Sequence, residues 1–124
     1  MKPIHFIIVL LLLLLLACGE EEAPWQVAFA EFSTALAEND SAAASEYLTK
    51  GKLAELKDYL SLGEAPAATG DWVTEGELHL LPVLTPGKAG LTLVWQEDDA
   101  DWKLDVSLTL EATRASALNA IFAQ

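Results

Sequence analysis

The spacing of apolar residues changes from a helical period to a strand period near residue 71, and this change limits the folds open to the chain. From Trp25 to Leu36 the apolar residues recur at steps of four, three and four, which is the spacing of one face of a helix. From Trp102 to Leu110 apolar and polar residues alternate, as in a strand with one buried and one wet face. Helices followed by consecutive strands predict an α+β domain.

Turn residues divide the helical part into three predicted helices. The first begins at Pro24, where the missing N–H of proline costs nothing, and ends at residues 39–41, which are able to cap the next helix. The second covers 42–49 and the third ends near Gly63. The apolar face of the third consists of Leu53, Leu56 and Leu60. A C-terminal helix is expected over 112–123, with Ala115, Leu118 and Phe122 as its apolar face.

The strands follow between 72 and 110. The first is expected to bury Trp72, Leu78 and Leu80 and to expose His79, while Gly76 indicates a bulge or bend. The second buries the alternate residues 91, 93 and 95, and the third is the alternating segment from 102. The expected architecture is a set of amphipathic helices on a curved antiparallel meander of three or more strands, with a short C-terminal helix.

An apolar leader precedes this domain and ends at Cys18, the only cysteine of the chain. The stretch from Ile4 to Ala17 is shorter than the ~20 apolar residues of a spanning helix and fits a secretory signal peptide. The segment Leu15-Leu16-Ala17-Cys18 resembles the bacterial lipobox. The resemblance implies cleavage before Cys18, diacylation of its thiol and acylation of the new amino terminus, and Gly19 after it implies the outer membrane. The alternatives are an ordinary signal peptide with an incidental cysteine and an uncleaved membrane anchor.

The chain therefore divides into a signal peptide (1–17), an acidic lipidated tether (18–23) and a single domain (24–124). It has 19 acidic and seven basic residues, with a net charge of −12. Nucleic-acid binding is excluded because phosphate contacts need a basic face, and direct docking on anionic lipid is disfavoured. Lipid on Cys18 is then the expected contact with the membrane.

The sequence predicts no catalytic residue, metal or cofactor. His79 is the only histidine after Cys18, and no Gly-x-Ser-x-Gly segment accompanies it. One histidine is too few for a zinc site of the common kinds. The acidic residues between Glu97 and Asp101 do not have the spacing of an EF-hand, so we interpret them as a solvated hairpin tip.

Six aromatic residues form the remaining candidate site: Trp25, Phe29, Phe32, Trp72, Trp95 and Trp102. The first three share one helix face and the others share the inward side of the strands. Large aromatics at such spacing usually pack as core. The alternative is a concave pocket, lined by these rings, for a small apolar ligand.

The domain resembles small envelope proteins of the nuclear-transport-factor-two-like class, in which helices close over a curved antiparallel sheet. The matching segments are Phe29-Ala30-Glu31-Phe32, Asn39-Asp40-Ser41 and Asp101-Trp102-Lys103-Leu104. The class includes enzymes and binding modules, so the fold supplies no function by itself. We expect a non-enzymatic accessory or interaction module, tethered at the periplasmic face of the outer membrane and able to contact an envelope protein. The alternative is a carrier or sensor of a small apolar ligand, held between the first helix and the sheet.

Overall fold

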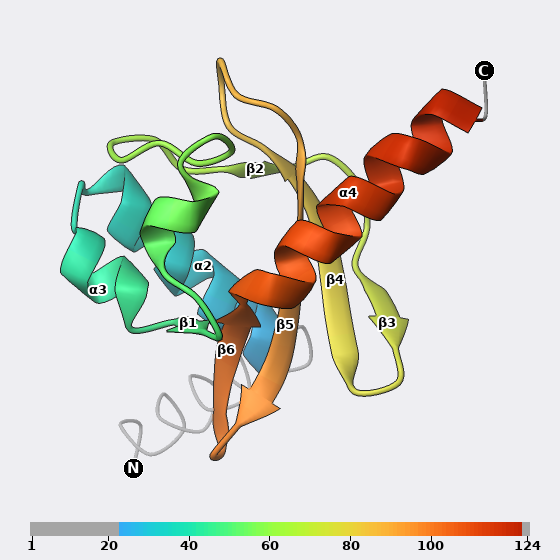
Figure 1. Cartoon of the computed structure of the whole chain (residues 1–124). Coiled ribbons are helices and arrows are strands. Elements are labelled where there is room, and N and C mark those ends of the chain that lie inside the picture. The colour runs from blue at the N-terminus through green and yellow to red at the C-terminus, as the bar shows by residue number, and fades with distance from the viewer. Residues whose placement is uncertain (1–22, 123–124) are drawn as a thin grey trace, which may run out of the picture.

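The computed structural model describes residues 23–122, which form helices and one mixed sheet (Figure 1). The leader, most of the tether and Cys18 lie outside these residues. In chain order the elements are α2 (Pro24–Ala37), α3 (Ser41–Ser45), β1 (Leu48–Thr49), the 3₁₀ helix η1 (Leu53–Leu56), β2 (Ala67–Ala68), β3 (Val73–Glu75), β4 (Leu78–Leu84), β5 (Leu91–Asp98), β6 (Asp101–Asp105) and α4 (Val106–Phe122). The predicted α+β class is confirmed.

The sheet is built around the antiparallel meander β4–β5–β6. Its strand order is β1-β6-β5-β4-β2, and β3 pairs with the same edge of β4 as β2. The strand β1 joins β6 in parallel, with Leu48 opposite Leu104, which makes the sheet mixed rather than purely antiparallel. The short segment after α3 is therefore tied to a strand that lies more than 50 residues later in the chain.

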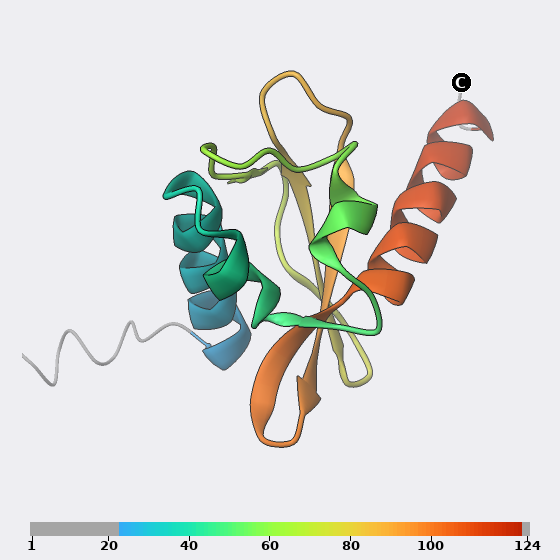
Figure 2. The ribbon, with the colours of Figure 1, turned by 60° about the vertical axis from the view of Figure 1, so that its left-hand side comes forward.

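Helices cover both sides of the sheet (Figure 2). On the α2 side, the side chains of Phe32, Leu93, Trp95 and Leu104 have no exposed surface. On the other side α4 packs on β5, where Val94 is 2% exposed. The helix α2 follows its predicted period closely, and the core lies between it and the inward residues of β4, β5 and β6.

The predicted first strand is a hairpin, and its second arm has the opposite parity from the one expected. The strand β3 ends at Glu75, and the chain reverses through Gly76, which has φ 61°. A positive φ suits glycine because it has no Cβ. His79 and Leu81 are consequently buried, opposite Trp95 and Leu93, so the predicted exposure of His79 is wrong.

The last predicted strand ends five residues early, at Asp105, and α4 begins there. The Oδ1 atom of Asp105 accepts a hydrogen bond from the N–H of Leu108 (2.9 Å), which caps the third N–H of the helix. The Asp105 side chain is fully buried; it also accepts a hydrogen bond from the Gln96 side chain and lies 3.5 Å from the ammonium of Lys50. The alternating residues 106–110 are therefore helical, and the predicted short C-terminal helix begins at 106 rather than 112 and has 17 residues. Of its predicted apolar face, Ala115 and Leu118 are exposed.

Two threonines of α4 close the edge of β5 beyond the end of β6. The N–H of Val94 donates to Thr109 Oγ1 (3.0 Å), and the N–H of Thr92 donates to Thr113 Oγ1 (2.9 Å). Four residues of a helix rise by about 6 Å, and two residues of a strand by about 6.6 Å. Because the two spacings agree, threonine hydroxyls on one face of α4 accept the β5 N–H groups that the carbonyls of a neighbouring strand would otherwise accept.

The second and third helices are shorter than predicted. The helix α3 begins after Asp40, whose Oδ1 accepts from the N–H of Ala43 (3.0 Å), and this confirms the predicted cap. The predicted third helix forms only the single 3₁₀ turn η1. Leu56 is fully buried, Leu60 is 6% exposed and Leu53 is half-buried, so the three predicted leucines still pack on the core although the long helix does not form.

Replacing Asp105 should destabilise the whole domain. The substitution Asp105→Ala removes the α4 cap and leaves the Gln96 amide without its partner, so we expect the free energy of unfolding to fall by about 2–4 kcal/mol. Urea unfolding measures this value. The exposed Asp101 at the other end of β6 provides the control, and Asp101→Ala should change stability by less than about 0.5 kcal/mol. Equal effects of the two substitutions would contradict the capping role.

Candidate functional site

The six predicted aromatics gather between α2 and the sheet. The Phe32 ring meets Trp95 edge to face at a centroid distance of 5.9 Å, and Phe29 meets Trp72 at 6.1 Å. Trp25 lies 5.3 Å from Trp102 in the same manner. Such edge contacts between rings add stability beyond the area that they bury. The structure therefore brings these residues together on the α2 side of the sheet, as their spacing in the sequence predicts.

His79 belongs to this cluster, which sequence reasoning missed. Its ring stacks on Trp25 at 3.7 Å with an interplanar angle of 6°, and it meets Trp102 at 5.2 Å. Its Nδ1 atom hydrogen-bonds the hydroxyl of Thr74 (3.1 Å). The signal that was available is the alternation of His79 with Leu81 and Val83, which are both buried. In this setting the imidazole packs as a flat ring against Trp25 and Trp102.

The acidic turn is the predicted hairpin tip. Asp99 and Ala100 join β5 to β6 with φ values of 54° and 70°, and two positive φ values match the twist of paired strands. Residues 97–101 are exposed. Within residues 23–122, no group of three or more histidine, cysteine or acidic side chains is arranged to hold a metal ion.

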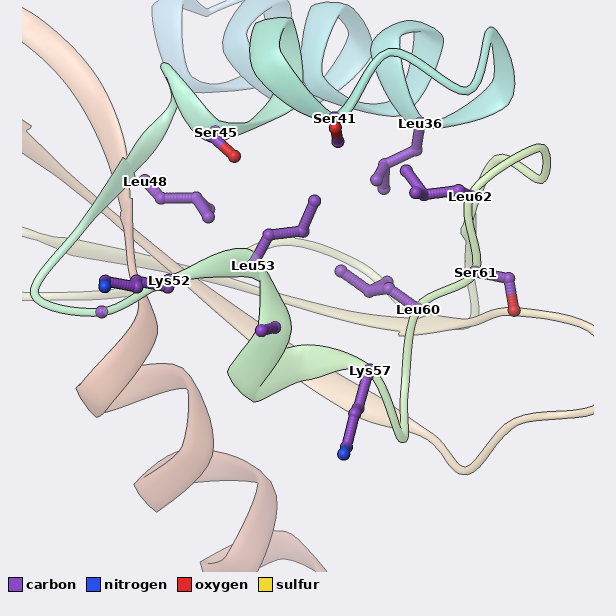
Figure 3. A pocket seen from close by; sticks show the side chains of 12 residues that line it. Leu36, Ser41, Ser45, Leu48, Lys52, Leu53, Lys57, Leu60, Ser61 and Leu62 are labelled. Carbon is purple, nitrogen blue, oxygen red and sulfur yellow. The ribbon is translucent and has the colours of Figure 1, made fainter.

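A second candidate site, which the sequence did not predict, is an apolar cleft of about 630 Å³ beside η1 (Figure 3). We call it the leucine cleft. Its lining comes from the end of α2, from α3, from β1 and from the segment 51–62, and consists of Leu36, Ser41, Ser45, Leu48, Gly51, Lys52, Leu53, Ala54, Lys57, Leu60, Ser61 and Leu62. The volume falls in the range of known small-molecule sites.

The side chains of the leucine cleft converge from separate elements. Leu48 and Leu53 point toward Leu36 and Leu62 across the space, and the hydroxyl of Ser45 points inward from α3 (Figure 3). Leu62 remains 49% exposed, so part of this apolar lining is open to water. The cleft exists because the predicted third helix stops after one turn and the chain then loops back toward α2, where the Gly63 N–H donates to the carbonyl of Leu36 (2.7 Å).

Tyr47, which directly precedes β1, contacts two residues of α2. The Tyr47 hydroxyl donates to the carboxylate of Glu31 on α2, and this hydrogen bond, with burial and the nearby charge, raises the pKa of Tyr47 to about 12. Tyr47 also packs on Phe32. The pair therefore fastens α2 to the segment that leads into the leucine cleft.

The burial of His79 should appear in the pH dependence of stability. Burial lowers its pKa below the ordinary value of 6.5, because the low-dielectric surroundings disfavour the charged ring. The unfolded chain then binds a proton that the folded chain does not. The contribution of His79 to the free energy of unfolding is fully present above pH 6.5. It falls as the pH drops toward the folded-state pKa.

We expect His79→Phe to reduce this loss, since phenylalanine keeps the stack on Trp25 and does not titrate. Urea unfolding of both proteins at about pH 7.5 and about pH 5.5 measures the difference. The same pH dependence in the two proteins would contradict the prediction.

Comparisons with known proteins give no match from which a role for these sites could be taken. Within residues 23–122 no helix is both long and apolar enough to cross a membrane. Cys18, the predicted lipidation site, lies outside the described residues. No protein-family model, curated protein or solved structure matches the chain.

Proposed function

We propose that this protein is a non-enzymatic accessory lipoprotein, held at the periplasmic face of the outer membrane by lipid on Cys18, and that it binds a small apolar ligand in the leucine cleft. The observation that carries the binding role is the cleft itself. Leucines from α2, from β1 and from the segment 51–62 line one space, and part of that lining is open to water. Burial of such apolar surface by a ligand is favourable at roughly 25 cal/mol per Å².

The leucine cleft is a better binding site than the aromatic cluster. Phe32 and Trp95 have no exposed surface and already contact each other. A ligand among these rings would have to displace close contacts in the core, whereas a ligand in the leucine cleft covers side chains such as Leu62 that water now reaches. An envelope protein that receives the ligand is the partner we propose.

The anchor is tested by Cys18→Ser. Without the thiol no acyl chains are attached, so the protein should lose labelling by a radioactive fatty acid and leave the membrane fraction. Cell fractionation with lipid labelling measures both. The neighbouring Gly19→Ser variant, which keeps the thiol, should remain labelled and membrane-bound. A Cys18→Ser protein that is processed and still retained by membranes would refute the anchor.

The cleft is tested by filling it. Ser45 is exposed and points into the cleft, so Ser45→Trp should occupy the space without disturbing the core. The probe is dodecanol carrying a photoreactive diazirine, added to membranes that contain the protein, with the labelled peptides located by mass spectrometry. We expect labelling of residues 48–62 to fall at least about fivefold.

The matched control is Ala30→Trp, an exposed position on α2 outside the cleft lining, which should leave the labelling unchanged. Labelling of Ser45→Trp at the wild-type level would remove the cleft from the proposal.

A further inference from the structure

We infer that the leucine cleft takes a fatty-acid anion, with the alkyl chain among the leucines and the carboxylate at the mouth beside Lys52 and Lys57. This inference rests on the proposed function, because it assigns the ligand class of the same cleft. It adds a charge preference that the apolar lining alone would not give.

The charge of the cleft lining is opposite to that of the chain. The whole sequence has 19 acidic and seven basic residues. The described residues that line the leucine cleft nevertheless include Lys52 and Lys57 and no carboxylate. In a protein of this composition, a lining with only positive charges favours an anionic ligand and disfavours a cationic one.

Other lysines already have partners within residues 23–122. The ammonium of Lys50 pairs with Asp105 at 3.5 Å, and that of Lys103 donates to the carbonyl of Glu46. Lys88 donates to the carbonyl of Lys57 (3.1 Å) and does not belong to the cleft lining. No ion pair is recorded in this part of the chain for the side chains of Lys52 or Lys57.

Lys52 and Lys57 are the two charged residues of the leucine cleft lining. Both residues are exposed, and the ammonium of Lys57 points away from the leucines (Figure 3). Lysine stems cover apolar surface while the charged ends stay in water. The carboxylate of Glu55, which is close to Lys52, accepts from the backbone N–H of Lys52 (2.7 Å) and so is held at the backbone. A ligand with an apolar chain and a terminal anion matches this order of apolar interior and cationic rim.

The test compares three diazirine probes with the same chain: dodecanoate, dodecanol and dodecylamine. Each is photolysed with the full-length protein in vesicles of neutral phosphatidylcholine, and labelling of residues 48–62 is quantified by mass spectrometry against labelling of the lipid. Two exposed ion pairs are worth a modest amount, so dodecanoate should label about threefold to tenfold more than dodecanol. Dodecylamine should label less than either.

The double variant Lys52→Gln and Lys57→Gln should abolish the preference for dodecanoate and leave dodecanol labelling unchanged. Arg114→Gln, an exposed cation on α4, is the control and should keep the preference. In the unaltered protein, high salt should reduce the preference because exposed charges are screened, and this measurement does not depend on the folding of a variant.

Equal labelling by dodecanoate and dodecanol would overturn the anion preference and leave the apolar site standing. A preference that survives the double variant or high salt would also overturn it. If none of the three probes labels residues 48–62, the proposed binding function fails as well.

Discussion

The buried carboxylate of Asp105 is the contact on which the arrangement of this domain depends. It ends β6, caps α4 through Leu108, and receives the side chains of Gln96 and Lys50. A buried charge is costly unless hydrogen bonds and an opposite charge compensate it, so these partners are held to one geometry. Lys50 directly precedes the segment that lines the leucine cleft. The direction of the last helix and the position of one cleft wall are therefore fixed at the same residue.

Local signals in the sequence predict some elements well and fail where two periods overlap. The helix α2 has a proline at its start and a regular apolar stripe. The strand β5 buries residues 91, 93 and 95 as predicted, but Val94 on its other face is buried as well, because α4 packs there. From Val106 to Leu110 the alternating pattern suits a strand, yet Asp105 can cap a helix at this point, and the cap prevails. The alternation predicts that Thr109 faces water, whereas it is buried and accepts a backbone N–H from β5. That contact depends on which strand lies beside α4, and the local pattern does not contain this information. The predicted exposure of His79 fails for a related reason, since the turn at Gly76 separates two strands that the pattern treats as one.

The two candidate sites differ in how far each can be predicted from local spacing in the sequence. The aromatic cluster follows from helix and strand spacing, because each element brings its rings to the same side of the sheet. The leucine cleft depends on a helix that stops after one turn and on the pairing of Leu48 with Leu104 far along the chain. Neither the early end of the helix nor this long-range pairing is indicated by the spacing of apolar residues. Lys52 and Lys57 neighbour Leu53 and Leu56 in the sequence, but they come together with Leu36 and Leu48 only after the segment has folded back against α2.

The closure of β5 by α4 has a consequence for molecules that are crowded together. An open strand edge offers N–H groups to a second chain and can start a shared sheet; here Thr109 and Thr113 already occupy those of Val94 and Thr92. The strands at the outer edges, β1, β2 and β3, have only two or three residues each. Fibril-like association between copies therefore finds little free backbone in the described sheet.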